Sequence, residues 1–230
     1  MTALTPVHRP TRPGGVLSIG AATLAMVVLA SMPSQYVAIG LILTAIGTGW
    51  VASRTWSGGY HVGAVVVLVI ATVLVVMGLL IAMTGPPRII DRVWLLPGLI
   101  GLVILALGLA PLRQSVAAQL VTAGTGGVFI ALLAAGVFVV PTSVTLVGAA
   151  IMTIVAWDAG HNALSLGTQI GRGARTGRTE VVHTLGALCV GVVTAAWVLA
   201  VEWVGFAGMT LGGFLVLGAG TVLLAIGLRS

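Results

Sequence analysis

The chain has 230 residues, of which 59% are hydrophobic and only 6% are charged. A soluble domain carries about a quarter charged residues, so this composition excludes a water-soluble fold. The length accommodates seven or eight apolar helices of about 20 residues with short connections, and we expect no separate soluble domain.

Basic residues outnumber acidic ones by ten to four, and all ten are arginines. Such an excess also occurs in nucleic-acid-binding proteins. In a membrane protein, however, basic residues gather at the cytoplasmic ends of helices, where they set the orientation and meet anionic headgroups. We therefore expect membrane lipids as partners and no nucleic acid. The single cysteine, Cys189, excludes a disulfide framework within one chain.

Polar residues with several prolines occupy positions 1–15, and we expect a disordered cytoplasmic tail there. The first apolar run follows, and Val28-Leu29-Ala30 within it also fits a signal-peptide cleavage site, so cleavage is left open. Pro and Gly separate the later runs because they disfavour a continued helix. The sequence predicts an all-α, polytopic transmembrane bundle, one domain over 16–230, with about eight spans near 16–32, 36–52, 62–83, 93–110, 120–140, 144–157, 181–204 and 208–228.

The arginine positions agree with an even number of spans. With the N-terminus inside, only Arg88 and Arg92 fall outside the membrane, and adding or removing one internal span would scatter arginines over both faces. We therefore expect a multi-pass protein of the cell membrane with both termini in the cytoplasm. The arginines predicted on the cytoplasmic side are Arg9, Arg12, Arg54, Arg113, Arg172, Arg175, Arg178 and Arg229.

Two local features concern helix packing. Gly124-Thr125-Gly126-Gly127 lacks the lysine and the preceding strand of a phosphate-binding loop, so we interpret these glycines as sites of close helix contact. Pro97 is expected to kink the fourth span.

The stretch 157–183 differs from the rest, because it holds two of the four acids, two of the four histidines and three of the ten arginines. If the sixth helix continues beyond the bilayer, its polar residues recur every three or four positions and occupy an arc of about 100°, with glycine and alanine on the far side. This pattern predicts a cytoplasmic helical extension at about 158–180 that bends or ends at 173–177. One side of this helix would be exposed to water, and the other side would be covered by a partner or by another part of the chain. The residues expected to contact a protein partner or lipid are Asp158, His161, Thr168, Arg172, Arg175, Arg178, Glu180 and His183.

The same stretch contains two acid-x-x-His pairs, Asp158 with His161 and Glu180 with His183. This spacing places a carboxylate and an imidazole on one helix face, as in di-iron bundles. A di-iron centre needs two further carboxylates, and the remaining two acids are predicted on the opposite side of the membrane. A single-metal site formed by the four residues stays open. The simpler interpretation pairs the acids with neighbouring arginines, and we expect no metal and no other cofactor.

The block WDAGHNALSLGTQIGRGARTGRTEVVH at 157–183 resembles an uncharacterised family of multi-pass membrane proteins from halophilic archaea. The resemblance covers 27 of the 230 residues. It implies a cell-membrane protein with no assigned activity, and association with an AAA-type ATPase system often encoded nearby. Relatives tend to carry an acid where this chain has His161, which weakens the metal hypothesis.

These observations favour an accessory or scaffolding subunit of a membrane assembly that docks a membrane or cytoplasmic protein through the 158–180 helix. A small-solute transporter or channel is the alternative, although the acids fall at predicted helix ends rather than near the bilayer midplane. A membrane enzyme with a site at the inner face is a third hypothesis. Formation of a homo-oligomer is left open.

Overall fold

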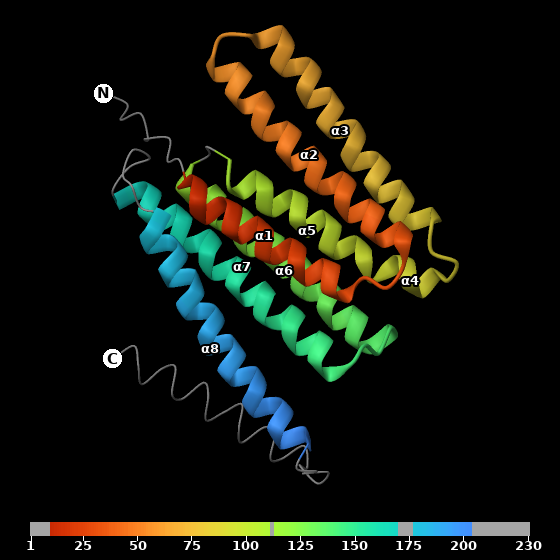
Figure 1. Cartoon of the computed structure of the whole chain (residues 1–230). Helices are drawn as coiled ribbons and strands as arrows, with labels where there is room; N and C mark the ends of the chain where they lie inside the picture. Colours follow the sequence, from red (N-terminus) through yellow and green to blue (C-terminus); the bar gives the residue numbers. More distant parts are fainter. Residues whose placement is uncertain (1–9, 111–112, 170–176, 204–230) are drawn as a thin grey trace. The chain divides into compact units, whose positions relative to one another are not determined.

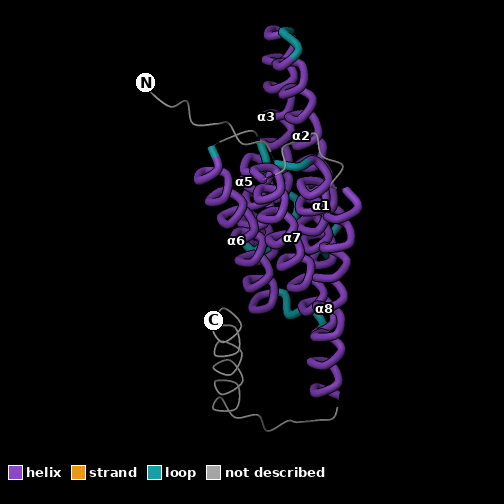
Figure 2. Tube along the Cα trace, turned by 90° about the vertical axis from the view of Figure 1, so that its left-hand side faces the viewer, coloured by secondary structure: helices purple, strands orange, loops and turns teal. Residues whose placement is uncertain are grey.

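A computed structural model describes residues 10–110, 113–169 and 177–203. The described residues form helices and no strands, joined by short loops (Figure 2), which confirms the all-α prediction. Seven membrane-length apolar helices occur in this part of the chain, with α4 and α5 counted together as one. The eighth predicted span, 208–228, lies outside the described residues. The helices are α1 Arg12–Leu29, α2 Pro33–Ser57, α3 His61–Thr84, α4 Ile89–Val93, α5 Leu95–Gly108, α6 Gln114–Phe138, α7 Ser143–Gln169 and α8 Gly177–Trp203.

The chain divides into two compact units, 1–192 and 193–230. The first contains α1 to α7 and most of α8. The described part of the second unit is the last portion of α8, which is mostly apolar and exposes Val193, Trp197 and Val198.

Proline positions account for two helix boundaries. Pro33 is the first residue of α2, where its missing N–H costs nothing and its fixed φ suits a helix start. Pro97 explains the break between α4 and α5, because its ring clashes with the carbonyl four residues earlier, at Val93, where α4 ends. The predicted kink in this span is therefore present as a break at Trp94.

Within the first unit, α2 packs with α3 and α5 packs with α6, each pair being consecutive in the chain. In contrast, α1 packs along α7, far away in the sequence, and also contacts α5 and α6 (Figure 1). Its inner face is fully buried at Ala22, Ala25 and Met26. The first helix is thus a central element of this unit.

Glycines allow the close approach of α5 and α6. A Cβ atom added to Gly101 would lie 2.5 Å from the carbonyl oxygen of Gly124, and one added to Gly127 would lie 2.8 Å from the carbonyl oxygen of Pro97. Gly126, by contrast, has no neighbouring atom within 4 Å of such a position. The interpretation of this glycine run as a packing element is confirmed for Gly124 and Gly127, which face α5.

The described arginines fall into two groups along the helix axes. Arg88 and Arg92 lie at the end where α1 connects to α2, since Gln35 donates a hydrogen bond to the nearby Asp91 carbonyl oxygen at 3.5 Å. The other described arginines lie at the opposite end, where α1, α6 and α8 begin and α2 ends. This grouping matches the one used to predict orientation, and the assignment of the second end to the cytoplasm stays a prediction. The second group consists of Arg12, Arg54, Arg113 and Arg178.

Candidate functional site

The sixth predicted span continues as one helix beyond Trp157. Helix α7 has 27 residues, so it is about 40 Å long, whereas a hydrocarbon core is about 30 Å thick. If Ser143 lies at one boundary of the hydrocarbon core, the last turns of α7 extend beyond the opposite boundary. The helical continuation predicted from the polar stripe is therefore present as far as Gln169. Arg172, Arg175 and the expected bend at 173–177 lie outside the described residues, apart from Gly177, where α8 begins.

The C-terminal end of the predicted extension, at about 158–180, falls at the start of the next helix. Arg178 and Glu180 lie in the first turn of α8, not at the end of the helix that contains Asp158. The acid-x-x-His pairs therefore stand on two different helices. The contact between Asp158 and His183, with that of Ile151 against Gly191, shows α7 and α8 side by side in opposite directions.

The small-residue face of α7 is covered by this chain's own helices. Ala159, Gly160 and Ala163 are buried. A Cβ atom added to Gly160 would lie 2.8 Å from a methyl carbon of Val121 in α6 and 3.0 Å from the hydroxyl of Ser18 in α1. This face was predicted to be covered by a partner or by another part of the chain. At these residues, α1 and α6 of the same chain cover it.

Two hydrogen bonds tie α1 to α7. The Ser18 hydroxyl donates to the carbonyl oxygen of Ala156 at 2.6 Å, and the backbone N–H of Thr11 donates to the carbonyl oxygen of Ala163 at 3.1 Å. Both acceptors lie within a helix, so they take a second hydrogen bond. The start of α1 is consequently fixed beside the C-terminal half of α7.

Glu180 is a buried carboxylate, with 1% of its surface exposed, and it lies at the N-terminus of α1. The Thr11 hydroxyl donates to its Oε2 atom at 2.6 Å. A Cβ atom on Gly14 would lie 2.5 Å from the same oxygen and 2.7 Å from the Cβ of Ala163, so the approach of these helices requires glycine here. The partial positive charge of a helix N-terminus favours a carboxylate in this position. Glu180 therefore stabilises the first turn of α1 from α8.

Asp158 and His183 form a second tie, between α7 and α8. The Nε2 atom of His183 lies 3.0 Å from Oδ2 of Asp158, and the two side chains are 50% and 33% exposed. The two groups form an ion pair only when the imidazole is protonated. Because both side chains are partly exposed, although the Oδ2 atom of Asp158 is itself buried, we expect this tie to be weaker than the one at Glu180.

His161 joins α7 to α6. Its Nε2 atom lies 3.1 Å from the hydroxyl of Thr122, and its ring lies against that of Trp157, with centroids 4.9 Å apart. His161 and Asp158 therefore use different partners, although they share one face of α7. The polar residues of this stretch link four helices.

The structure does not gather the four residues of the single-metal hypothesis. Among the described residues, no group of three or more histidines, cysteines and acids could hold a metal ion. Two other residues predicted for the site take no part in these contacts between helices. The Thr168 hydroxyl binds the carbonyl oxygen of Ser165 in its own helix at 2.7 Å, and Arg178 is exposed at the start of α8.

The sequence interpretation missed the partners of these residues, namely Thr11, Gly14, Ser18 and Thr122. Helix α1 begins at Arg12, within the predicted disordered tail, and Thr11 is buried. A signal for this start was present, since a threonine followed shortly by proline is typical of a helix N-terminus. Residues 1–9 of the predicted tail lie outside the described residues.

Fold and site together define a polytopic α-helical membrane protein in which a polar cluster connects α1, α6, α7 and α8. This cluster consists of Asp158, His161, Glu180 and His183 with their partners Thr11 and Thr122. The model of a family of unknown function, DUF7519, matches residues 79–225, which is more than half of the chain. The chain belongs to this family. The match includes the whole of 157–183 but not α1. No curated protein and no solved structure shows a significant match.

Proposed function

We propose that this chain is an accessory or scaffolding subunit of a membrane assembly. The observation that carries the proposal is that acids and histidines of the 157–183 stretch bind residues of the same chain. Glu180 binds Thr11, Asp158 binds His183, and His161 binds Thr122. These contacts join helices into a fixed arrangement, as a platform for partner subunits requires.

The proposed docking surface is the exposed side of this end of the bundle. Ser165 and Gln169 face outward on α7, and Arg178 is exposed at the start of α8. Arginine suits this role because its planar guanidinium binds carboxylates through two hydrogen bonds at once. The partner we propose is therefore a protein with an acidic surface. The resemblance to the archaeal family favours a component of an AAA-type ATPase system.

Gentle detergent extraction of the tagged chain, followed by quantification of co-purifying proteins, tests this proposal. We expect at least one partner in stoichiometric amount, and we expect Arg178→Glu to remove it. Arg88→Glu is the matched control, because Arg88 is also exposed but lies at the other end of the bundle. Absence of a stoichiometric partner, or equal loss in both variants, would contradict the proposal.

A small-solute transporter or channel is the second candidate. The observation that favours it is the Asp158–His183 pair, which joins two helices of membrane-spanning length and whose side chains are partly exposed. Ionisable groups within such helices commonly mark solute or proton pathways. Solute flux into vesicles that contain the purified chain, lost in Asp158→Asn, would favour transport over scaffolding.

A further inference from the structure

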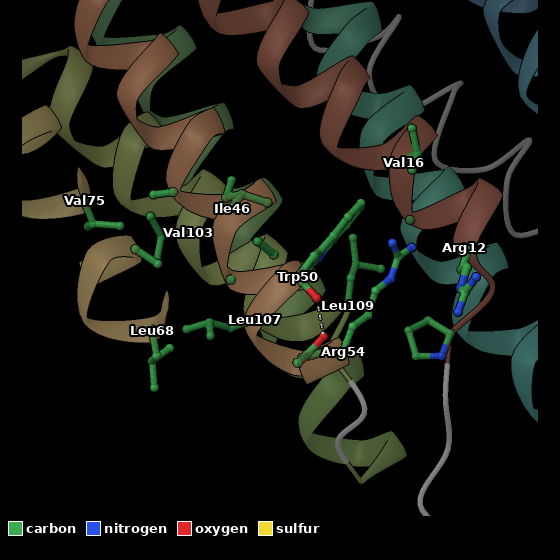
Figure 3. A pocket seen from close by; sticks show the side chains of 18 of the residues that line it. Arg12, Val16, Ile46, Trp50, Arg54, Leu68, Val75, Val103, Leu107 and Leu109 are labelled. Atoms are coloured by element: carbon green, nitrogen blue, oxygen red, sulfur yellow. Dashed lines mark hydrogen bonds between the residues drawn. The ribbon is translucent and has the colours of Figure 1, made fainter. Parts of the chain in front are cut away.

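A cavity of about 470 Å³ opens at the arginine-rich end (Figure 3), and of the residues that form the ties described above only Thr11 lines it. It lies between the N-terminal end of α1, the C-terminal half of α2, the middle of α3 and the C-terminal half of α5. Its volume is within the range of small-molecule sites, about 300–1,000 Å³.

Apolar side chains form the deeper walls. Ile46 contributes from α2, Leu68 and Val75 from α3, and Val103 from α5. Ile46 precedes Arg54 by eight residues, which corresponds to about 12 Å along the helix. The cavity therefore extends from the headgroup level into the depth of the hydrocarbon, where an apolar chain is the fitting occupant.

Two arginines stand at the mouth. Figure 3 shows the side chain of Arg54 extending from α2 toward α1, where Arg12 lies. Neither arginine forms an ion pair with any described residue, and the described residues that line the cavity include no acid. Two guanidinium groups that approach each other repel, and an anion between them turns this repulsion into attraction. Guanidinium groups bind phosphate oxygens well because several N–H donors lie in one plane.

We infer that this cavity binds an anionic phospholipid, with the phosphate at Arg12 and Arg54 and an acyl chain against the apolar walls. Trp50 also lines the cavity, four residues from Arg54, and tryptophan prefers the headgroup level. A soluble anion would use the arginines but leave the apolar walls without a ligand. A zwitterionic lipid would bring a cation for which the lining offers no carboxylate.

Native mass spectrometry of the full chain in detergent tests this inference. The chain is titrated with phosphatidylglycerol and, separately, with phosphatidylcholine that has the same acyl chains. We expect the first phosphatidylglycerol to bind on the order of tenfold more tightly, and an Arg12→Gln, Arg54→Gln double variant to lose this preference. Arg113→Gln is the control, since Arg113 lies at the same end but does not line the cavity.

Three outcomes would overturn the inference. Equal affinity for both lipids would remove the anionic preference, and an equal loss in Arg113→Gln would indicate general surface attraction. Displacement of the lipid by millimolar inorganic phosphate would indicate a site for a soluble anion. Ala71→Phe provides a second variant, because Ala71 lines the cavity and is nearly buried, and the larger ring should fill it. We expect this variant to weaken phosphatidylglycerol binding although both arginines remain.

Discussion

The hydrogen bond between Thr11 and Glu180 connects two residues 169 positions apart, and a double-mutant cycle can measure its strength. The cycle uses Thr11→Val, Glu180→Gln and the double variant. Valine removes the hydroxyl at nearly constant volume, and glutamine removes the charge. Because Glu180 is almost fully buried, water cannot replace the lost donor without rearrangement of the helices.

Two estimates bound the expected coupling energy. Hydrogen bonds to charged groups contribute about 1.5–3 kcal/mol in soluble proteins. Hydrogen bonds between transmembrane helices average about 0.6 kcal/mol and reach about 1.7 kcal/mol. Since this bond combines a charged acceptor with a position at a helix end, we expect a coupling of about 1–1.7 kcal/mol. Glu180→Gln alone should cost more than Thr11→Val, because it also removes the charge from the N-terminus of α1.

Equilibrium unfolding in mixed micelles with increasing dodecyl sulfate, followed by circular dichroism, gives the four free energies of unfolding. Thr168→Val combined with Glu180→Gln is the control cycle, since the Thr168 hydroxyl binds only within α7. These two changes should be additive to about 0.3–0.5 kcal/mol. If the changes at Thr11 and Glu180 are additive within the same limit, the charge of Glu180 does not strengthen its bond to Thr11 and our account of the first turn of α1 is wrong.

Three further predictions concern packing, topology and metal content. Gly101→Ala should lower the free energy of unfolding by about 1–3 kcal/mol because its Cβ would meet the backbone of α6, whereas Gly126→Ala, with open space, should raise it by about 0.5–1 kcal/mol in the same unfolding assay. Reporter fusions after Arg54 and Arg113 should report the cytoplasm, and insertions at 84–91 the exterior; a cytoplasmic signal from 84–91 would refute the predicted orientation. Elemental analysis of the purified chain should find no stoichiometric transition metal, and one zinc or iron per chain would revive the metal hypothesis.

The positions of the helices could be predicted from the sequence because the signals that mark a helix are local. Apolar runs of about 20 residues, with Pro33 as a boundary and Pro97 as a kink within the fourth run, reproduce the spans of the described part of the chain. The glycines of α6 were also recognised as packing residues, since small residues in an apolar run have few other uses.

The partners within the polar cluster could not be predicted in the same way. Helical periodicity places Asp158 and His161 on one face of α7, but it does not say which helices lie against that face. Thr11 and Thr122 reach the cluster from α1 and α6. Thr11 was assigned to the tail because hydropathy marks the apolar part of a helix and not its polar first turn.

The position of Glu180 also links the polar cluster to the cavity. Thr11 and Arg12 both line the cavity, whereas Glu180 does not, yet Glu180 binds Thr11 at the start of α1. Weakening of this bond should loosen the first turn of α1 and with it the guanidinium of Arg12. The effect on lipid affinity cannot exceed the energy of the bond, so we expect Glu180→Gln to weaken phosphatidylglycerol binding about threefold, which corresponds to about 0.6 kcal/mol. Asp158→Asn should leave the affinity unchanged, because Asp158 pairs with His183 of α8 and does not line the cavity. If both variants bind phosphatidylglycerol like the parent chain, the first turn of α1 holds Arg12 without Glu180. A loss in Asp158→Asn as large as that in Glu180→Gln would instead show that the polar cluster positions the whole end of the bundle as one unit.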